Sequence, residues 1–193
     1  MMDEMKSALE RALERAEGMG RLSPEEMQRQ NEARYVPIGE AIAQRFLEHG
    51  YVSVMAEQLE KIEAEGKEIA VRAALSELVE GIDLEDNDLI ERALSGIIGL
   101  RGASDAERVA DEIKALRGQY AWQKKLLYEE NSAEMGKGIK EWMSAAGISG
   151  SAVAGVNLAK DEAWGRKSDE LRAEFFSRLQ EMKRELRRTL GKP

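Results

Sequence analysis

The sequence predicts an all-α protein, a multi-helix bundle with a long C-terminal antiparallel helical hairpin. Only three prolines occur in 193 residues, and none lies in the 155 residues from Ile38 to Lys192. Proline interrupts a helix because it lacks a backbone N–H and clashes with the preceding turn, so its absence favours helix. Charged residues make up 34 % of the chain and aromatic residues 5 %, a composition typical of amphipathic helices.

Capping residues and apolar spacing predict the first helices. One helix is expected over residues 3–17. The next begins at Ser23, whose side chain caps the helix while Glu26 completes a capping box. Pro37 is expected in the first turn of a third helix that ends at Gly50.

Two further helices are expected over residues 52–65 and 67–81, because apolar residues recur at helical spacing and Gly66 separates them. A shorter helix follows an acidic turn.

That acidic turn, residues 83–88, concentrates carboxylates as a calcium loop does. It lacks the EF-hand pattern, since Asp88 stands where the loop needs glycine and Leu94 stands where a bidentate glutamate belongs. We therefore expect a plain acidic turn in which Asn87 or Asp88 caps the following helix.

The last third predicts two long helices of nearly equal length. The first begins at a capping box of Ser104 and Glu107 and runs to about Glu130, and the second runs from about Glu162 to Leu190. Each would span roughly 40 Å, which suggests an antiparallel hairpin. The second helix carries an apolar stripe of Leu171, Phe175, Leu179, Met182, Leu186 and Leu190.

Three regions are expected: N-terminal helices over residues 1–34, an acidic helical body over residues 35–102, and the long hairpin over residues 103–193. The net charge of −8 is unevenly spread. Residues 35–118 carry 18 acidic and 9 basic side chains, whereas residues 166–193 carry 5 acidic and 9 basic ones. An acidic body repels phosphate backbones, so duplex DNA is not an expected partner.

The opening segment resembles a group of small, uncharacterised bacterial helical proteins of unknown function. The likeness covers about the first 40 residues and is carried by Lys6-Ser7-Ala8-Leu9-Glu10 and by Leu22-Ser23-Pro24-Glu25-Glu26. The resemblance implies a bacterial protein, and it transfers no functional residue.

No catalytic, cofactor or metal motif is recognised. The chain has no cysteine, and His49 is its only histidine, so zinc sites and di-iron bundle motifs that need two histidines do not fit. We expect His49 to lie at a helix C-terminus, on the surface. Residues 142–159 contain no charge, but small residues dilute their hydrophobicity below that of a membrane span. This stretch is either a close-packed core segment or an interface.

The N-terminal residues 1–13 include three acidic side chains and do not resemble an export signal, so a cytoplasmic location is expected.

The expected function is that of a non-enzymatic helical interaction or scaffold protein. The expected partner is another protein, with a second copy of this chain favoured, because the stripe that includes Phe175, Leu179, Met182 and Leu186 is wider than one neighbouring helix covers. The alternative is an anionic-surface binder, for lipid or RNA, that uses Lys183, Arg184, Arg187 and Arg188. A helical enzyme with an unrecognised site is the second alternative.

Overall fold

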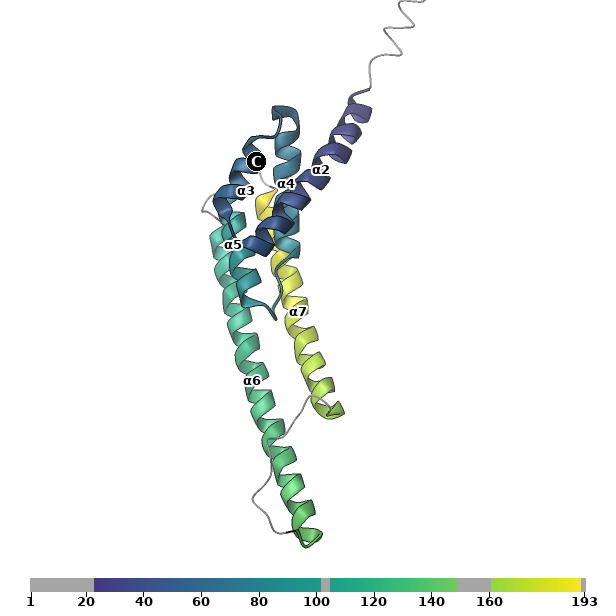
Figure 1. Cartoon of the computed structure of the whole chain (residues 1–193), viewed down its shortest axis with the longest axis vertical. Helices are drawn as coiled ribbons and strands as arrows, with labels where there is room; N and C mark the ends of the chain where they lie inside the picture. Colours follow the sequence, from purple (N-terminus) through teal and green to yellow (C-terminus); the bar gives the residue numbers. More distant parts are fainter. Residues whose placement is uncertain (1–22, 102–104, 149–160, 192–193) are drawn as a thin grey trace, which may run out of the picture. The chain divides into compact units, whose positions relative to one another are not determined.

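A computed structural model describes residues 23–101, 105–148 and 161–191 of the chain. In these ranges the chain forms six helices and no strand, which confirms the predicted all-α class (Figure 1). The expected helix over residues 3–17 and the cap at Ser104 lie outside the described residues, as does most of the uncharged stretch.

The chain divides into two compact units, residues 1–74 and residues 75–193, with the boundary inside helix α4 (Ala64–Glu80). Helix α2 (Pro24–His49) is continuous across the region boundary expected after residue 34.

The first unit begins with α2, and its start confirms the predicted capping box. Ser23 Oγ accepts a hydrogen bond from Glu26 N at 3.2 Å, and Glu26 Oε2 accepts one from Ser23 N at 2.8 Å. The helix ends at Gly50, whose φ of 80° reverses the chain direction and whose N–H donates to Phe46 O. Both ends of α2 are therefore readable from the sequence.

The expected start of a new helix at Pro37 is wrong, because Pro37 lies inside α2. An interior proline removes one backbone hydrogen bond and costs about 3 kcal/mol. Buried side chains on both sides of it, Tyr35 before and Ile42 and Phe46 after, offset that cost by packing.

The break between α3 (Val52–Glu60) and α4 falls at residues 61–63 and not at Gly66 as expected. Gly66 lies in the first turn of α4, where an added Cβ would come within 2.4 Å of the Tyr35 ring. The same ring is held by its hydroxyl, which donates to Glu63 Oε2 at 2.6 Å. The glycine is therefore required for packing rather than for ending a helix.

A second close approach joins α2 to the first half of α4. A Cβ on Gly39 would lie 2.1 Å from the carbonyl oxygen of Ala70, so only glycine allows this helix crossing. Helix α3 packs on α2 as well.

The second unit contains α5 (Asn87–Arg101), which packs on α6 (Asp105–Ala145) with Ile90, Leu94 and Ile97 buried. The residue that caps α5 is Asp86, whose Oδ1 accepts from Leu89 N at 2.9 Å, so the expectation of Asn87 or Asp88 is wrong by one position.

Helices α6 and α7 (Glu162–Leu190) lie side by side in antiparallel orientation, which confirms the predicted hairpin (Figure 1). The bounds of α7 agree with the prediction, and Asp161 caps it by accepting from Trp164 N at 2.6 Å. The expected equality of length is wrong, since α6 has 41 residues and α7 has 29. No proline follows Glu130 in α6, and isolated glycines lower helix stability by only about 1 kcal/mol each.

Candidate functional site

The basic end of α7 is partly used within the chain. Lys183 is only 3 % exposed, and its Nζ donates to the backbone oxygen of Glu80 at 2.9 Å. Arg187 forms an ion pair with the carboxylate of the same Glu80. Burial lowers the pKa of Lys183, although the nearby Glu80 carboxylate opposes that shift. The acidic middle of the sequence thus supplies an internal counter-ion.

Arg184 and Arg188 are exposed. The four cations named for the alternative function, binding to an anionic surface, are therefore divided, because Lys183 and Arg187 contact Glu80 while the other two face solvent.

The apolar residues expected to bind a partner lie mostly in the core of the second unit. Phe175, Leu179 and Leu186 are at most 1 % exposed, and Met182 is half-buried. The Phe175 ring packs on Tyr120 of α6 with centroids 5.5 Å apart. Phe176, the next residue after Phe175, points away from this core and is 51 % exposed.

Among the described residues, the end of α6 extends past the start of α7 and forms a different surface. The start of α7 lies beside Tyr128 and Asn131 of α6: the Trp164 ring meets Tyr128 edge to face, and Lys167 Nζ donates to Asn131 Oδ1 at 2.8 Å. Helix α6 continues to Ala145, about 20 Å further at 1.5 Å per residue (Figure 1). We call residues 132–145 the distal segment and residues 105–131 the proximal segment.

The distal segment continues the apolar periodicity of the helix. Met135, Ile139, Trp142 and Met143 are spaced by four, three and one residues and share one face. Trp142 is 67 % exposed, and the other three are half-buried. This stripe was missed at the sequence level, because the helix was expected to end near Glu130.

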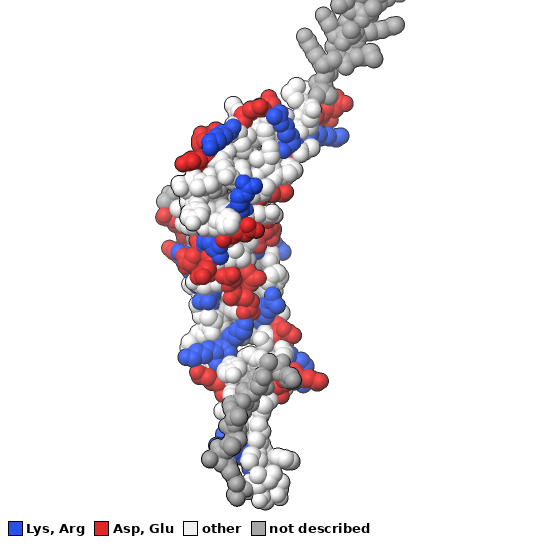
Figure 2. All heavy atoms as spheres, in the orientation of Figure 1, with Lys and Arg blue, Asp and Glu red and all other residues white. Residues whose placement is uncertain are grey.

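The charge of the distal segment is balanced by Glu134, Lys137, Lys140 and Glu141. On the visible side of Figure 2, the end of α6 is mostly uncoloured, whereas acidic and basic atoms alternate over the rest of the hairpin. The described part of the uncharged stretch, residues 142–148, belongs to this surface, and Ile148 is 49 % exposed.

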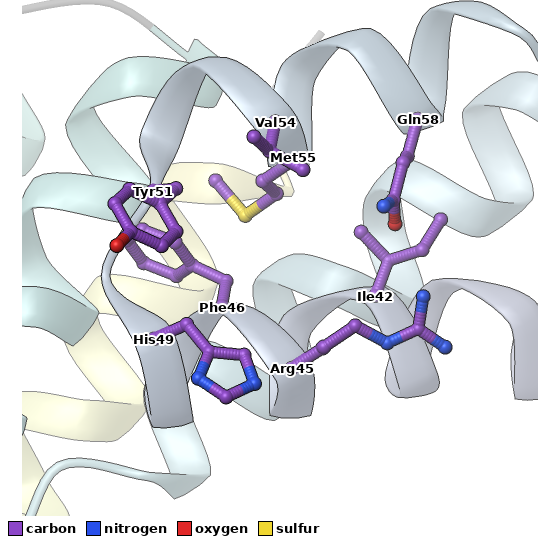
Figure 3. A pocket seen from close by; sticks show the side chains of 8 residues that line it. All are labelled: Ile42, Arg45, Phe46, His49, Tyr51, Val54, Met55 and Gln58. Atoms are coloured by element: carbon purple, nitrogen blue, oxygen red, sulfur yellow. The ribbon is translucent and has the colours of Figure 1, made fainter.

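A small pocket lies between α2 and α3 in the first unit (Figure 3). Ile42, Arg45 and Phe46 reach it from α2, and Met55 from α3. His49, the last residue of α2, lies at its rim, 3.8 Å from the Glu48 carboxylate, which confirms the expected helix-end position. The pocket volume of about 60 Å³ is far below the roughly 300 Å³ of small-molecule sites.

No group of three or more His, Asp or Glu side chains among the described residues could hold a metal ion. None of the described helices is both long enough and apolar enough to cross a membrane.

Comparison of the chain with protein-family models, with curated proteins and with solved structures gives no match.

Proposed function

We propose that this chain is a non-enzymatic interaction protein that pairs with a second copy of itself through the distal segment of α6. The observation that carries the proposal is the apolar face of Met135, Ile139 and Trp142, which extends past the start of α7. Apolar helix faces that stay partly exposed favour a helical partner. The stripe around Phe175 contributes less to this proposal, because the chain buries it.

Antiparallel pairing about a two-fold axis at Ile139 makes the segment self-complementary. In that register Gly136 is level with Trp142 of the other copy, so the largest side chain meets the smallest. Met135 is level with Met143 by the same symmetry, which joins apolar residues. Such large-to-small pairing is what close helix packing requires.

The charged residues do not obstruct this register. Lys137 and Glu141 lie two residues from Ile139, on the opposite face of the helix, so they stay in solvent when the apolar faces meet. Because the segment has no net charge, two copies approach without the repulsion that the acidic remainder of the chain would cause.

Sedimentation at increasing protein concentration tests the pairing. We expect wild-type protein to reach twice the chain mass and Ile139→Glu to remain monomeric, because a buried unpaired carboxylate at the axis is costly. Trp122→Ser is the matched control, since Trp122 is 62 % exposed on the proximal segment. Monomeric wild-type protein at high micromolar concentration would refute the proposal.

The register can be tested separately, because the chain contains no cysteine. In an Ile139→Cys variant the two sulfurs face each other across the axis, so mild oxidation should give a disulfide-linked dimer. A Trp122→Cys variant should stay unlinked under the same conditions. Equal linking of both variants would indicate random collision rather than a defined interface.

A further inference from the structure

We propose that an open groove beside the proximal segment of α6, which we call the α6 groove, binds a small anion that carries a planar aromatic ring. The groove lies within the second unit, between the turn before α5 and the first turn of α7, and has a volume of about 380 Å³. That volume is within the range of small-molecule sites. The inference does not depend on the dimer proposed above.

The groove is positively charged within an acidic protein. Arg117, Lys124 and Lys125 line it together with a single carboxylate, Glu85, which leaves a net charge of +2. Arg172 also acts on Glu85 electrostatically. By contrast, a second groove of the hairpin is lined by three glutamates and one lysine, for a net charge of −2. An anion is therefore attracted to the first groove and repelled from the second.

A carboxylate and an aromatic ring hold Lys124 in place. Glu85 accepts a hydrogen bond from Lys124 Nζ at 2.6 Å and another from the Tyr120 hydroxyl, and the ammonium group lies 5.4 Å from the centre of the Tyr120 ring. Arg117 lines the same groove, and its Nε is buried with no hydrogen-bond partner in the part of the chain that the structure describes. Because this nitrogen is buried, Arg117 acts on a bound anion through the charge of its guanidinium group.

The protonation of the groove suits an anion at neutral pH. Burial by itself raises the pKa of Glu85, but hydrogen bonds from Lys124 and Tyr120 outweigh it, so the pKa lies below its ordinary value. Burial and the adjacent Glu85 carboxylate raise the pKa of Tyr120. Tyr120 therefore remains a neutral donor, and the groove keeps its net positive charge.

The other end of the groove provides a surface for a ring. Tyr128 and Trp164 meet edge to face, with centroids 5.5 Å apart and planes at 87°, and Tyr128 is 45 % exposed. Leu84 and Ala121 add apolar atoms to the wall of the groove. A planar ring stacked on Tyr128 would place its anionic group near Lys124, one helical turn away, while Arg117 adds positive charge further along the groove.

Calorimetric titration of the full chain with adenosine monophosphate and with indole-3-acetate tests the proposal, and the two probes distinguish a phosphate from a carboxylate. We expect at least one to bind, and its affinity to fall with added salt. Adenosine, which lacks the anion, and ribose 5-phosphate, which lacks the ring, should bind about tenfold more weakly or not at all. Failure of both aromatic anions to bind at millimolar concentration would overturn the proposal.

Variants locate the binding. Arg117→Gln and Tyr128→Ser should each weaken the aromatic anion about tenfold, because the first removes a positive charge of the groove and the second removes the ring surface. Lys114→Gln is the matched control, because Lys114 is a cation of the same helix that pairs with Glu91 and does not line the groove. Binding that is unchanged in both groove variants would place the ligand elsewhere and contradict the proposal.

A fluorescence measurement tests the site without changing any residue that lines the groove. With Trp122 and Trp142 replaced by Phe, Trp164 is the one remaining tryptophan of the three in the chain. Adenosine monophosphate bound in the groove should change its emission with the same affinity that calorimetry gives, whereas indole-3-acetate is itself fluorescent and is followed by calorimetry alone. Calorimetric binding of adenosine monophosphate without any change in Trp164 emission would count against this site.

Discussion

The proximal and distal segments of α6 carry the same kind of apolar stripe but have different surroundings. Along the proximal segment, Val109, Ile113 and Leu116 are at most 1 % exposed against neighbouring helices. Along the distal segment, Trp142 is 67 % exposed and Ile139 is half-buried, because α7 begins beside Asn131. Helical spacing therefore predicts that the apolar face of α6 will pack against something. How much of that face α7 covers depends on the length of α7.

The largest expected difference between the segments is in stability. Phe175→Ala, on the helix that covers the proximal segment, should lower the free energy of unfolding by about 3–5 kcal/mol, because a fully buried ring leaves a cavity. Ile139→Ala should cost less than about 1 kcal/mol in dilute protein. Urea denaturation followed by circular dichroism measures both. Equal losses would mean that the distal segment belongs to the same core.

A smaller effect should come from the polar contact beside the proximal segment. Tyr120→Phe removes the hydrogen bond to the charged Glu85 and should cost about 1.5–3 kcal/mol at neutral pH. Because the folded-state pKa of Glu85 is lowered, its contribution is present above the ordinary value of 4.5 and is lost as the pH falls through the folded-state pKa. Wild type and variant should therefore converge in acid. Trp142→Phe, the distal counterpart, should show no such pH dependence.

Lys183 tests whether a buried charge limits the stability of the hairpin. Lys183→Met should raise the free energy of unfolding at neutral pH by about 1 kcal/mol, because burial of the ammonium is costly. The folded-state pKa lies below the ordinary 10.5, so the unfolded chain binds more protons and wild-type stability gains from this group as the pH rises towards 10.5. The advantage of the variant should shrink over that range. An advantage that instead grew with pH would mean that the ammonium is stabilising.

The smallest expected effect comes from a closely matched pair of substitutions at two exposed glycines. A Cβ on Gly118 of the proximal segment or on Gly138 of the distal segment would meet no atom within 4 Å. Alanine is the better helix former by about 0.5–1 kcal/mol, so Gly118→Ala should raise the unfolding midpoint measurably. Gly138→Ala should raise it less, since we expect the distal segment, which extends past the start of α7, to unfold locally before the rest. Thermal denaturation of both variants decides this, and equal gains would contradict the separation of the two segments.

Local chemistry determined the fold class and several helix ends. The capping box at Ser23 and the glycine at Gly50 act within a few residues of their own position, so their effect is written in the sequence. The bounds of α7 were predictable for the same reason, since its apolar stripe repeats without interruption.

Tertiary packing decided the features that depend on distant residues. Pro37 stays inside α2 and Gly66 inside α4 because of what packs beside them. The groove around Glu85 and Trp164 joins residues nearly 80 positions apart, which no local pattern relates. The basic end of α7 is a further example. The sequence shows four cations there, but the position of Glu80 in the folded chain decides that Lys183 and Arg187 face the protein. A sequence determines which faces are apolar or charged, and burial depends on the surfaces that the folded chain brings against them.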